Sequence, residues 1–251
     1  MPFNDKIITL ITGANGGIGF ELASQLLADG KNFVLLGSRS QEKGEAAVQE
    51  LKKRSLPGTV ELVQVDVSDE QSIAKAAGEV EEKYSRIDAL VNNAAIAGET
   101  PPTHSLPRRL TAAFLTNSTG PAIVVESFAP LLSKSTAKTP RIVNVTSGAG
   151  SISLRLDSEN PHQQMKVVPY RMSKAALNML TACQAYEYGP LGWKVFAFCP
   201  GFTASGLSDM NKEELGAKPT REGASPIVDI LAGKRDGEHG GFLHAGGQHP
   251  W

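Results

Sequence analysis

The sequence predicts an α/β protein with a doubly wound parallel sheet and helices on both of its faces. Short β-branched or apolar runs alternate along the chain with longer helical patterns, as in right-handed βαβ units. A glycine-rich turn at residues 12–19 joins the first apolar run to the first helical pattern, as in folds that bind a dinucleotide. Together, these two observations favour a single-domain, Rossmann-type arrangement.

The apolar runs predict the strands, and the patterns between them predict the helices. In chain order, the expected strands are residues 6–12, 32–37, 59–65, 87–92, 141–146 and 193–199, with a short last strand at 241–244. The expected helices are 17–29, 41–54, 69–84, 106–133 and 169–188. The least regular segments, 148–168 and 202–224, follow strands of a parallel sheet. Because ligands bind at the carboxyl ends of such strands, we expect both segments to rim the substrate cleft.

Length and composition fit one domain that covers residues 1–251. A chain of 251 residues with 41% hydrophobic residues suits one α/β domain better than two. The net charge of −1 gives no basic surface for a nucleic acid. The five histidines and two cysteines show no metal-ligand spacing, so no metal is expected. We expect Cys183 and Cys199 to be two buried, unpaired thiols.

No stretch of the sequence predicts a membrane or a secretory segment. No apolar run reaches the length of a membrane span. The first residues lead almost directly into a strand, with no long apolar region after a basic start. We therefore expect no membrane partner and a cytoplasmic location.

The glycine-rich turn predicts a pyrophosphate site. Gly13, Gly17 and Gly19 follow a strand and open a helix. Glycines let the backbone approach a pyrophosphate closely, and the helix N-terminus offers free N–H groups. We expect Thr12 and Asn15 to brace the loop. An ordinary turn is the alternative, and the strand–turn–helix context favours binding.

The end of the second strand predicts the cofactor. An acidic side chain there would bind a ribose 2′-hydroxyl and repel a 2′-phosphate. This chain has Ser38 and Arg39 instead, and a guanidinium beside a hydroxyl favours NADP(H). A solvated surface arginine is the alternative. The glycine loop has Gly16 where a second basic residue would help, so the preference depends almost entirely on Arg39.

Tyr170, Lys174 and Ser147 predict proton transfer at a carbonyl oxygen. Tyr170 and Lys174 stand four positions apart and share one helix face. A phenol is a poor acid at neutral pH, and a neighbouring ammonium lowers its pKa toward the working range. Ser147 ends an apolar run, where a strand would deliver its hydroxyl to the cleft. A surface pair and a strand-end serine are the alternatives.

At these residues the chain resembles the classical short-chain dehydrogenase/reductase family. The matching stretches fall in the family's order and cover nearly the whole chain: 12–19, 66–67, 92–95, Asn117, Ser147, 170–174 and 200–201. Within the family, the segment 87–97 and the final Trp251 are most similar to the carbonyl reductases.

The resemblance implies a role for each catalytic residue. Tyr170 would donate the proton in reduction and accept it in oxidation. Lys174 would lower the pKa of Tyr170 and hold the nicotinamide ribose. Ser147 would stabilise charge on the substrate oxygen, and Asn117 would hold a water that connects Lys174 to solvent.

The resemblance also implies the remaining cofactor contacts. Asp66 and the Val67 backbone would contact adenine, although Asp66 could instead be a helix N-cap. The full expected set comprises Thr12, Gly13, Asn15, Gly17, Ile18, Gly19, Ser38, Arg39, Asp66, Val67, Asn93, Ala94, Tyr170, Lys174, Pro200, Gly201, Thr203 and Ser205. The family usually has glycine in place of Ala95 and threonine in place of Ser205.

The spacing from Ser147 to Tyr170 departs from the family. The two residues are 23 positions apart, more than the usual gap. The extra residues, 155–162, are polar with a proline and predict a surface loop. This loop precedes a helix that relatives use to assemble, so we expect a monomer or a non-standard dimer. Alternatively the loop folds over the substrate, with His162, Gln163 and Met165 near the mouth.

The function predicted from these features is NADPH-dependent reduction of a ketone or aldehyde. A secondary-alcohol dehydrogenase running in the oxidative direction is one alternative. A non-catalytic NADP(H)-sensing protein is another, which the complete set of four catalytic residues argues against. The partner expected is a small carbonyl or alcohol substrate in a mainly apolar pocket, with side chains from Leu154, Met165, Phe202, Leu207 and Met210.

Overall fold

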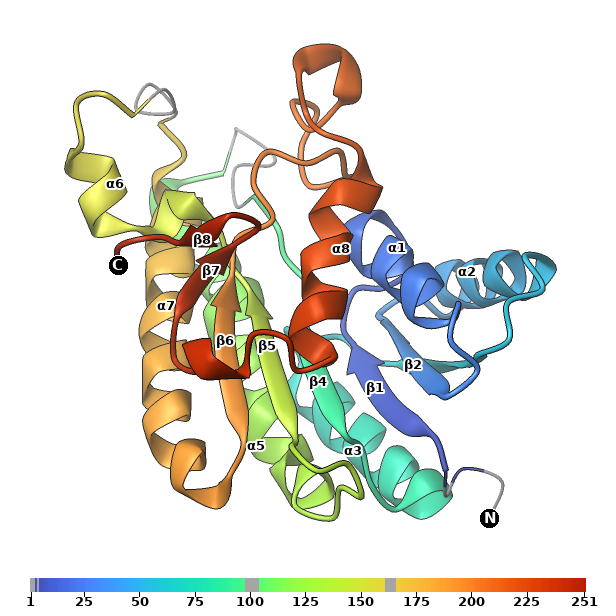
Figure 1. Cartoon of the computed structure of the whole chain (residues 1–251). Coiled ribbons are helices and arrows are strands. Elements are labelled where there is room, and N and C mark those ends of the chain that lie inside the picture. Colours follow the sequence, from blue (N-terminus) through green and yellow to red (C-terminus); the bar gives the residue numbers. More distant parts are fainter. Residues whose placement is uncertain (1–2, 4, 98–103, 161–165) are drawn as a thin grey trace.

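A computed structural model describes residues 3, 5–97, 104–160 and 166–251 (Figure 1). The strands are β1 (Ile7–Ile11), β2 (Asn32–Ser38), β3 (Thr59–Gln64), β4 (Ala89–Asn92), β5 (Arg141–Val145), β6 (Lys194–Phe198), β7 (Phe242–His244) and β8 (Gly247–Gln248). They form one sheet in the order β3-β2-β1-β4-β5-β6-β7-β8. The pairs from β3 to β7 are parallel, and β8 runs antiparallel to β7. The predicted doubly wound fold is confirmed, and β8 is an addition to it.

The helices match the predicted pattern with some additions. The α-helices are α1 (Gly17–Leu26), α2 (Gln41–Lys53), α3 (Glu70–Tyr84), α4 (Leu106–Phe114), α5 (Gly120–Leu132), α6 (Ile152–Leu156), α7 (Val168–Tyr188) and α8 (Thr220–Leu231). A π-helix, η1 (Leu115–Thr119), joins α4 to α5. Short 3-10 turns are η2 (Gly148–Gly150), η3 (Gly189–Leu191), η4 (Glu213–Leu215) and η5 (Asp236–Glu238).

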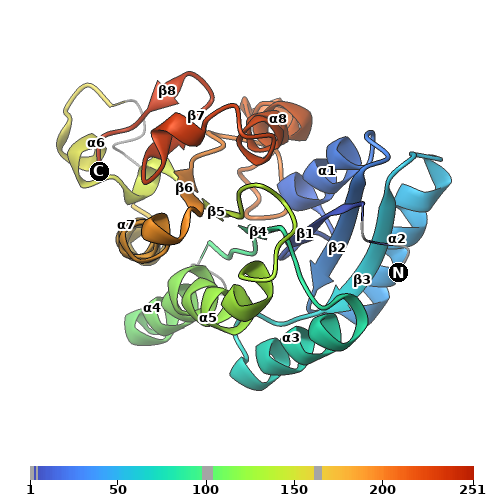
Figure 2. The same ribbon diagram turned by 60° about the horizontal axis from the view of Figure 1, so that its bottom comes forward.

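Two apolar cores cover the two faces of the sheet. Helices α1, α2 and α8 pack on one face, and α3, α5 and α7 pack on the other (Figure 2). Side chains of a strand alternate between the faces. In β5, for example, Ile142 enters the core beside α3 and α5, while Val143 enters the core beside α1 and α8. Because each strand buries side chains on both faces, its register against the neighbouring strands is fixed. The carboxyl ends of the strands lie outside these two cores and are available for a site.

Two helices lie in segments that the sequence predicted to be irregular. Helix α6 includes Arg155 and Leu156, which were expected in a loop; it has only five residues, too few for a visible period. Helix α8 includes residues 220–224, so the prediction of irregular structure over 202–224 is wrong at its end. Pro226 lies inside α8 and obscured its pattern. Cys183 is exposed, against the expectation that both thiols are buried.

Gly150 allows η2 to approach α7 closely. A Cβ atom on Gly150 would lie 2.6 Å from the carbonyl carbon of Lys174 and 2.8 Å from the nitrogen of Ala175. Both are backbone atoms inside a helix and cannot turn aside. Ser147, three residues before Gly150, is therefore held near α7 by the absence of a side chain at Gly150.

We predict that Gly150→Ala destabilises the protein by about 1–3 kcal/mol, the usual cost of overpacking. Gly148→Ala in the same turn is the matched control, because its added methyl would have no neighbour closer than 3.5 Å. Denaturant unfolding measures both. Equal stability of the two variants would contradict the close approach.

Candidate active site

A cavity of about 400 Å³ lies at the carboxyl ends of the strands. It opens at the point where the order of the strands reverses: β2 and β3 lie on one side of β1, and β4 and the later strands lie on the other. This switch point is where α/β folds bind ligands. The expected residues that line it are Gly13, Asn15, Gly17, Ile18, Ser38, Arg39, Asp66, Val67, Asn93, Ala94, Tyr170, Lys174, Pro200 and Ser205.

The glycine loop forms the floor of the cavity. Gly13 and Gly17 have φ values of 63° and 56°, a region that favours glycine. A Cβ on Gly13 would lie 2.8 Å from the Cα of Ala94, whereas Gly16 has nothing within 4 Å. The start of α1 therefore presents free backbone N–H groups to open space. This cradle fits the pyrophosphate of a dinucleotide.

Thr12, Gly19 and Asn93 shape the loop from behind. The Thr12 hydroxyl accepts from the backbone nitrogens of Asn93 (3.0 Å) and Ala94 (3.1 Å). The Asn93 amide donates to the carbonyls of Thr12 (3.0 Å) and Gly13 (3.1 Å). A Cβ on Gly19 would lie 2.5 Å from that amide nitrogen. Thr12 and Gly19, which do not line the cavity, thus support residues that do.

The end of β2 brings two cations to the cavity. Arg39 and Lys43 both line it and are exposed. Neither makes an ion pair with any residue that the structure describes. Ser40 caps α2 by accepting from the Lys43 nitrogen at 3.3 Å, so this helix also starts at the cavity. Sequence reasoning missed Lys43, although its place in the first turn after a capping serine was a usable signal.

Asp66 and Val67 line the cavity at the end of β3. Asp66 accepts from the nitrogen (2.9 Å) and the hydroxyl (2.6 Å) of Ser68. The N-cap of α3 is Asp69, which accepts from the nitrogen of Gln71 at 3.0 Å. The helix-cap alternative for Asp66 is therefore wrong.

The segment after β6 forms the opposite wall. Pro200 and Ser205 line the cavity together with Gly206 and Leu207, which the sequence did not single out. Gly201 turns the chain with a φ of 74°. Thr203 is buried, and its hydroxyl donates to the Pro200 carbonyl at 3.0 Å. Gly201 and Thr203 shape this wall without lining it.

Tyr170, Lys174 and Ser147 meet beside the cavity. The Lys174 ammonium donates to the Val145 carbonyl at 2.8 Å and lies 5.8 Å from the centre of the Tyr170 ring. The Ser147 side chain is near enough to Tyr170 to lower the pKa of its phenol. Ser147 also accepts from the Ala149 nitrogen at 3.1 Å. The phenol, the ammonium and the hydroxyl thus converge from α7 and the end of β5.

Asn117 lies in the π-helix η1 and is fully buried. Its amide accepts from the Ile96 nitrogen (2.9 Å) and donates to the Ile96 carbonyl (2.8 Å) and the Ser173 hydroxyl (3.0 Å). It therefore ties the chain after β4 to α7. π-Helices are common at functional sites because they redirect a side chain. The sequence predicted a continuous helix here and gave no sign of the bulge.

Burial is the main cause of the pKa shifts of Tyr170 and Lys174. It raises the pKa of Tyr170 far above its ordinary value, and the nearby Ser147 hydroxyl opposes that shift. It also lowers the pKa of Lys174 to about 7. The Lys174 amine is directed at the Val145 carbonyl, and burial is the largest influence on the Tyr170 pKa in this structure.

Other features of the chain bear on the site. Among the described residues, no group of three or more His, Cys, Asp or Glu side chains could hold a metal ion. No helix within the described ranges is long and apolar enough to cross a membrane. Residues 161–165 of the expected rim segment 148–168, which include His162, Gln163 and Met165, lie outside the described residues.

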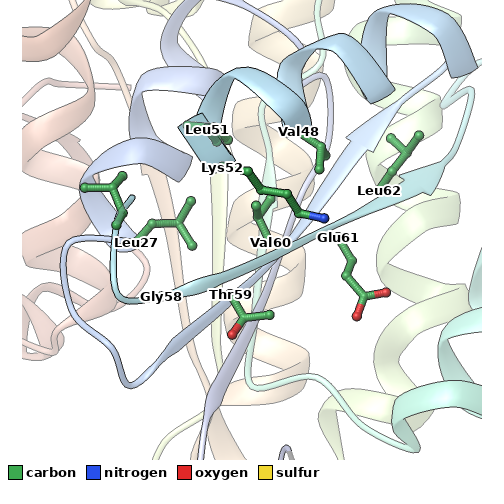
Figure 3. Close-up of a pocket in the computed structure, with 10 residues that line it drawn as sticks. Leu27, Val48, Leu51, Lys52, Gly58, Thr59, Val60, Glu61 and Leu62 are labelled. Carbon is green, nitrogen blue, oxygen red and sulfur yellow. The ribbon is translucent and has the colours of Figure 1, made fainter. Parts of the chain in front are cut away.

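A second hollow, of about 460 Å³, lies at the edge strand β3 (Figure 3). Its walls come from the ends of α1 and α2 and from the start of β3, including Leu27, Leu51 and Val60. It lies away from the catalytic residues and holds none of them.

Comparison with known proteins identifies the family. A family model described as short chain dehydrogenase matches residues 7–216, and the chain belongs to this family. It is 38% identical to the short-chain dehydrogenase anuI of Penicillium roqueforti, over 89% of this chain and 87% of that one. It is 32% identical to (+)-neomenthol dehydrogenase of Arabidopsis thaliana, over 88% and 90%. The crystal structure of NADPH-bound carbonyl reductase from chicken fatty liver is similar with a TM-score of 0.80, at 27% identity, over 98% of this chain and 100% of that one. The protein is thus an oxidoreductase that acts on alcohol or carbonyl groups with a nicotinamide cofactor.

We predict that removing the buried amine of Lys174 makes the protein more stable, most strongly at and below pH 7. Below pH 7 Lys174 is protonated in both the folded and the unfolded protein, and the folded protein bears the full cost of burying the charge. Between about pH 7 and 10.5 only the unfolded chain is protonated, so the wild type gains stability as pH rises. The advantage of Lys174→Met should therefore shrink from about pH 7 to 9.5 in denaturant unfolding. Lys53→Met, at an exposed position on α2, should show no such trend. A pH-independent advantage for Lys174→Met would rule out this account.

Proposed function

We propose that the protein reduces a ketone or an aldehyde to an alcohol with NADPH. The observation that carries this proposal is the convergence of Tyr170, Ser147 and Lys174 beside the cavity that the glycine loop floors. Burial keeps the Tyr170 phenol protonated, which is the protonation state that reduction requires at the start. The similarity to an NADPH-bound carbonyl reductase supports the same direction.

In the proposed reaction the side chains handle the proton and the developing charge. A bound nicotinamide supplies a hydride to the carbonyl carbon. The Ser147 hydroxyl donates a hydrogen bond to the carbonyl oxygen and stabilises its negative charge. The Tyr170 hydroxyl passes its proton to that oxygen and becomes a phenolate. Lys174, when protonated, is the nearby cation that stabilises the phenolate.

Two alternatives differ in direction or in chemistry. The same groups would run in reverse in a secondary-alcohol dehydrogenase, with Tyr170 taking the proton. A non-catalytic NADP(H) sensor would need the glycine loop but not Ser147, Tyr170 and Lys174 together beside the cavity. The expected monomer or non-standard dimer and the cytoplasmic location stay predictions.

We predict that Tyr170→Phe lowers kcat by at least about 10²-fold, the usual contribution of a positioned proton donor. The Kd for NADPH should stay within a few fold, because the ring that lines the cavity is retained. NADPH oxidation followed at 340 nm with aromatic ketones, diketones, aldehydes and quinones measures the first quantity, and fluorescence titration measures the second. Wild-type kcat in the variant would assign the proton to another group.

The preference for NADP(H) is proposed from the cations at the end of β2. Arg39 and Lys43 line the cavity at the end of β2, and this strand end carries no carboxylate. Helix α2 begins between the two residues. A 2′-phosphate there would meet a planar guanidinium, an ammonium and a helix N-terminus. Glu42, in the first turn of α2, is the nearest acidic residue in sequence and does not line the cavity.

We predict that Arg39→Asp lowers the ratio of kcat/KM for NADPH over NADH by about 10- to 100-fold, the loss expected for a charged hydrogen bond. Lys43→Gln should lower it by a smaller factor. Lys53→Gln, an exposed lysine in the last turn of the same helix, is the control. An unchanged ratio in both test variants would remove these cations from cofactor selection.

A further inference from the structure

Residues 247–251 form a strap that crosses from β8 to α6 (Figure 1). Its start is held where the His249 nitrogen donates to the Phe242 carbonyl at 2.7 Å. Its end is held by two serines next to α6. The Ser151 hydroxyl donates to the Pro250 carbonyl at 2.7 Å, and Ser153 donates to the Trp251 carbonyl from its nitrogen (3.1 Å) and its hydroxyl (2.8 Å). The strap therefore has a fixed position relative to the turn that follows Ser147.

The strap brings His249 close to Gly148, the residue that follows Ser147. A methyl group added to Gly148 would lie 3.7 Å from the His249 Nε2 atom, 3.9 Å from the Cys199 sulfur and 3.5 Å from a Leu154 methyl. These three side chains thus surround the residue that directly follows Ser147. They therefore lie one residue along the chain from the Ser147 hydroxyl, which faces the reacting oxygen in the proposed reaction.

The His249 ring is fixed in orientation, but its nitrogens are free. It stacks on His244 with ring centres 4.3 Å apart and meets the Phe242 ring at 65°. Within the part of the chain that the structure describes, neither ring nitrogen of His249 makes a hydrogen bond. Burial, and then the charge of His244, lower the pKa of His249. The neutral ring offers one donor and one acceptor.

The second polar group near Gly148, the Cys199 thiol, already takes part in hydrogen bonds. The Cys199 sulfur accepts from the nitrogens of Gly148 (3.1 Å) and Gly201 (3.4 Å). Burial raises the pKa of this thiol, so it stays protonated. Leu154 supplies apolar surface next to Gly148. Among these groups, His249 is the one with unused hydrogen-bonding capacity.

We propose that His249 is a substrate-contacting residue that selects carbonyl compounds with a second oxygen next to the reacting carbonyl, such as α-hydroxy or α-oxo aromatic ketones. This inference depends on the proposed reductase function. Ser147 and Tyr170 hold the reacting oxygen, and His249 hydrogen-bonds the neighbouring oxygen from the side of Gly148. The apolar remainder of the substrate lies along Leu154.

The test compares two ketones of nearly equal shape, 2-hydroxyacetophenone and propiophenone, which differ by a hydroxyl in place of a methyl. The measured quantity is the ratio of their kcat/KM values with NADPH, because intrinsic reactivity cancels when variants are compared. We expect His249→Phe and His249→Ala each to lower the ratio by about 5- to 10-fold, the effect of one neutral hydrogen bond. His249→Gln, which keeps a donor and an acceptor, should retain part of it.

His244→Phe is the matched control, since it makes the same change in the stacked partner. Its ratio should stay within about twofold of wild type, and the Kd for NADPH should be unchanged in all variants, because the strap does not line the cofactor cavity. A wild type that reduces both ketones, with the same ratio in His249→Phe and His249→Ala, overturns this inference and leaves the proposed function standing. A wild type that reduces no carbonyl compound overturns both.

Discussion

The burial of one amine, Lys174, constrains the whole carboxyl edge of the sheet. Only 2% of this residue is exposed, and a charge held out of water costs several kcal/mol unless polar groups replace the water. Val145 ends β5 with its carbonyl directed at the amine. Gly150 lets the next turn rest on the backbone of Lys174 itself. The strand, the turn and α7 are thus arranged around a group that is expensive to bury.

Sequence reasoning found the parts of the site that carry short, local signals. The glycine loop, the Tyr170–Lys174 spacing and Arg39 are each readable within a few residues, and the structure brings them to one cavity. The shift of the Tyr170 pKa was not predictable, because desolvation depends on the packed fold. The contact of His249 with Gly148 was not either, since about a hundred residues separate the two and no pattern links them.

The two halves of the site are built by different means. The cofactor side uses backbone, with a glycine loop that Thr12 and Asn93 brace from behind. The side proposed for the substrate uses side chains from distant segments, which the strap and α6 hold together. The backbone loop admits few changes, because Gly13 and Gly19 each lie too close to a neighbour for a side chain. The side-chain wall can change one residue at a time, so substrate choice can vary while the cofactor site stays constant.

The π-helix at Asn117 makes the length of its segment as important as its composition. A π-helical turn accommodates one residue more than an α-helical turn of the same span. Loss of a single residue within 115–119 would restore regular α-helical winding and remove the wide turn that directs Asn117. Asn117 reaches both Ile96 and Ser173, so loss of the wide turn would break both attachments. In-frame deletions are therefore a more severe class of change here than substitutions, and natural variation in this stretch should conserve residue number.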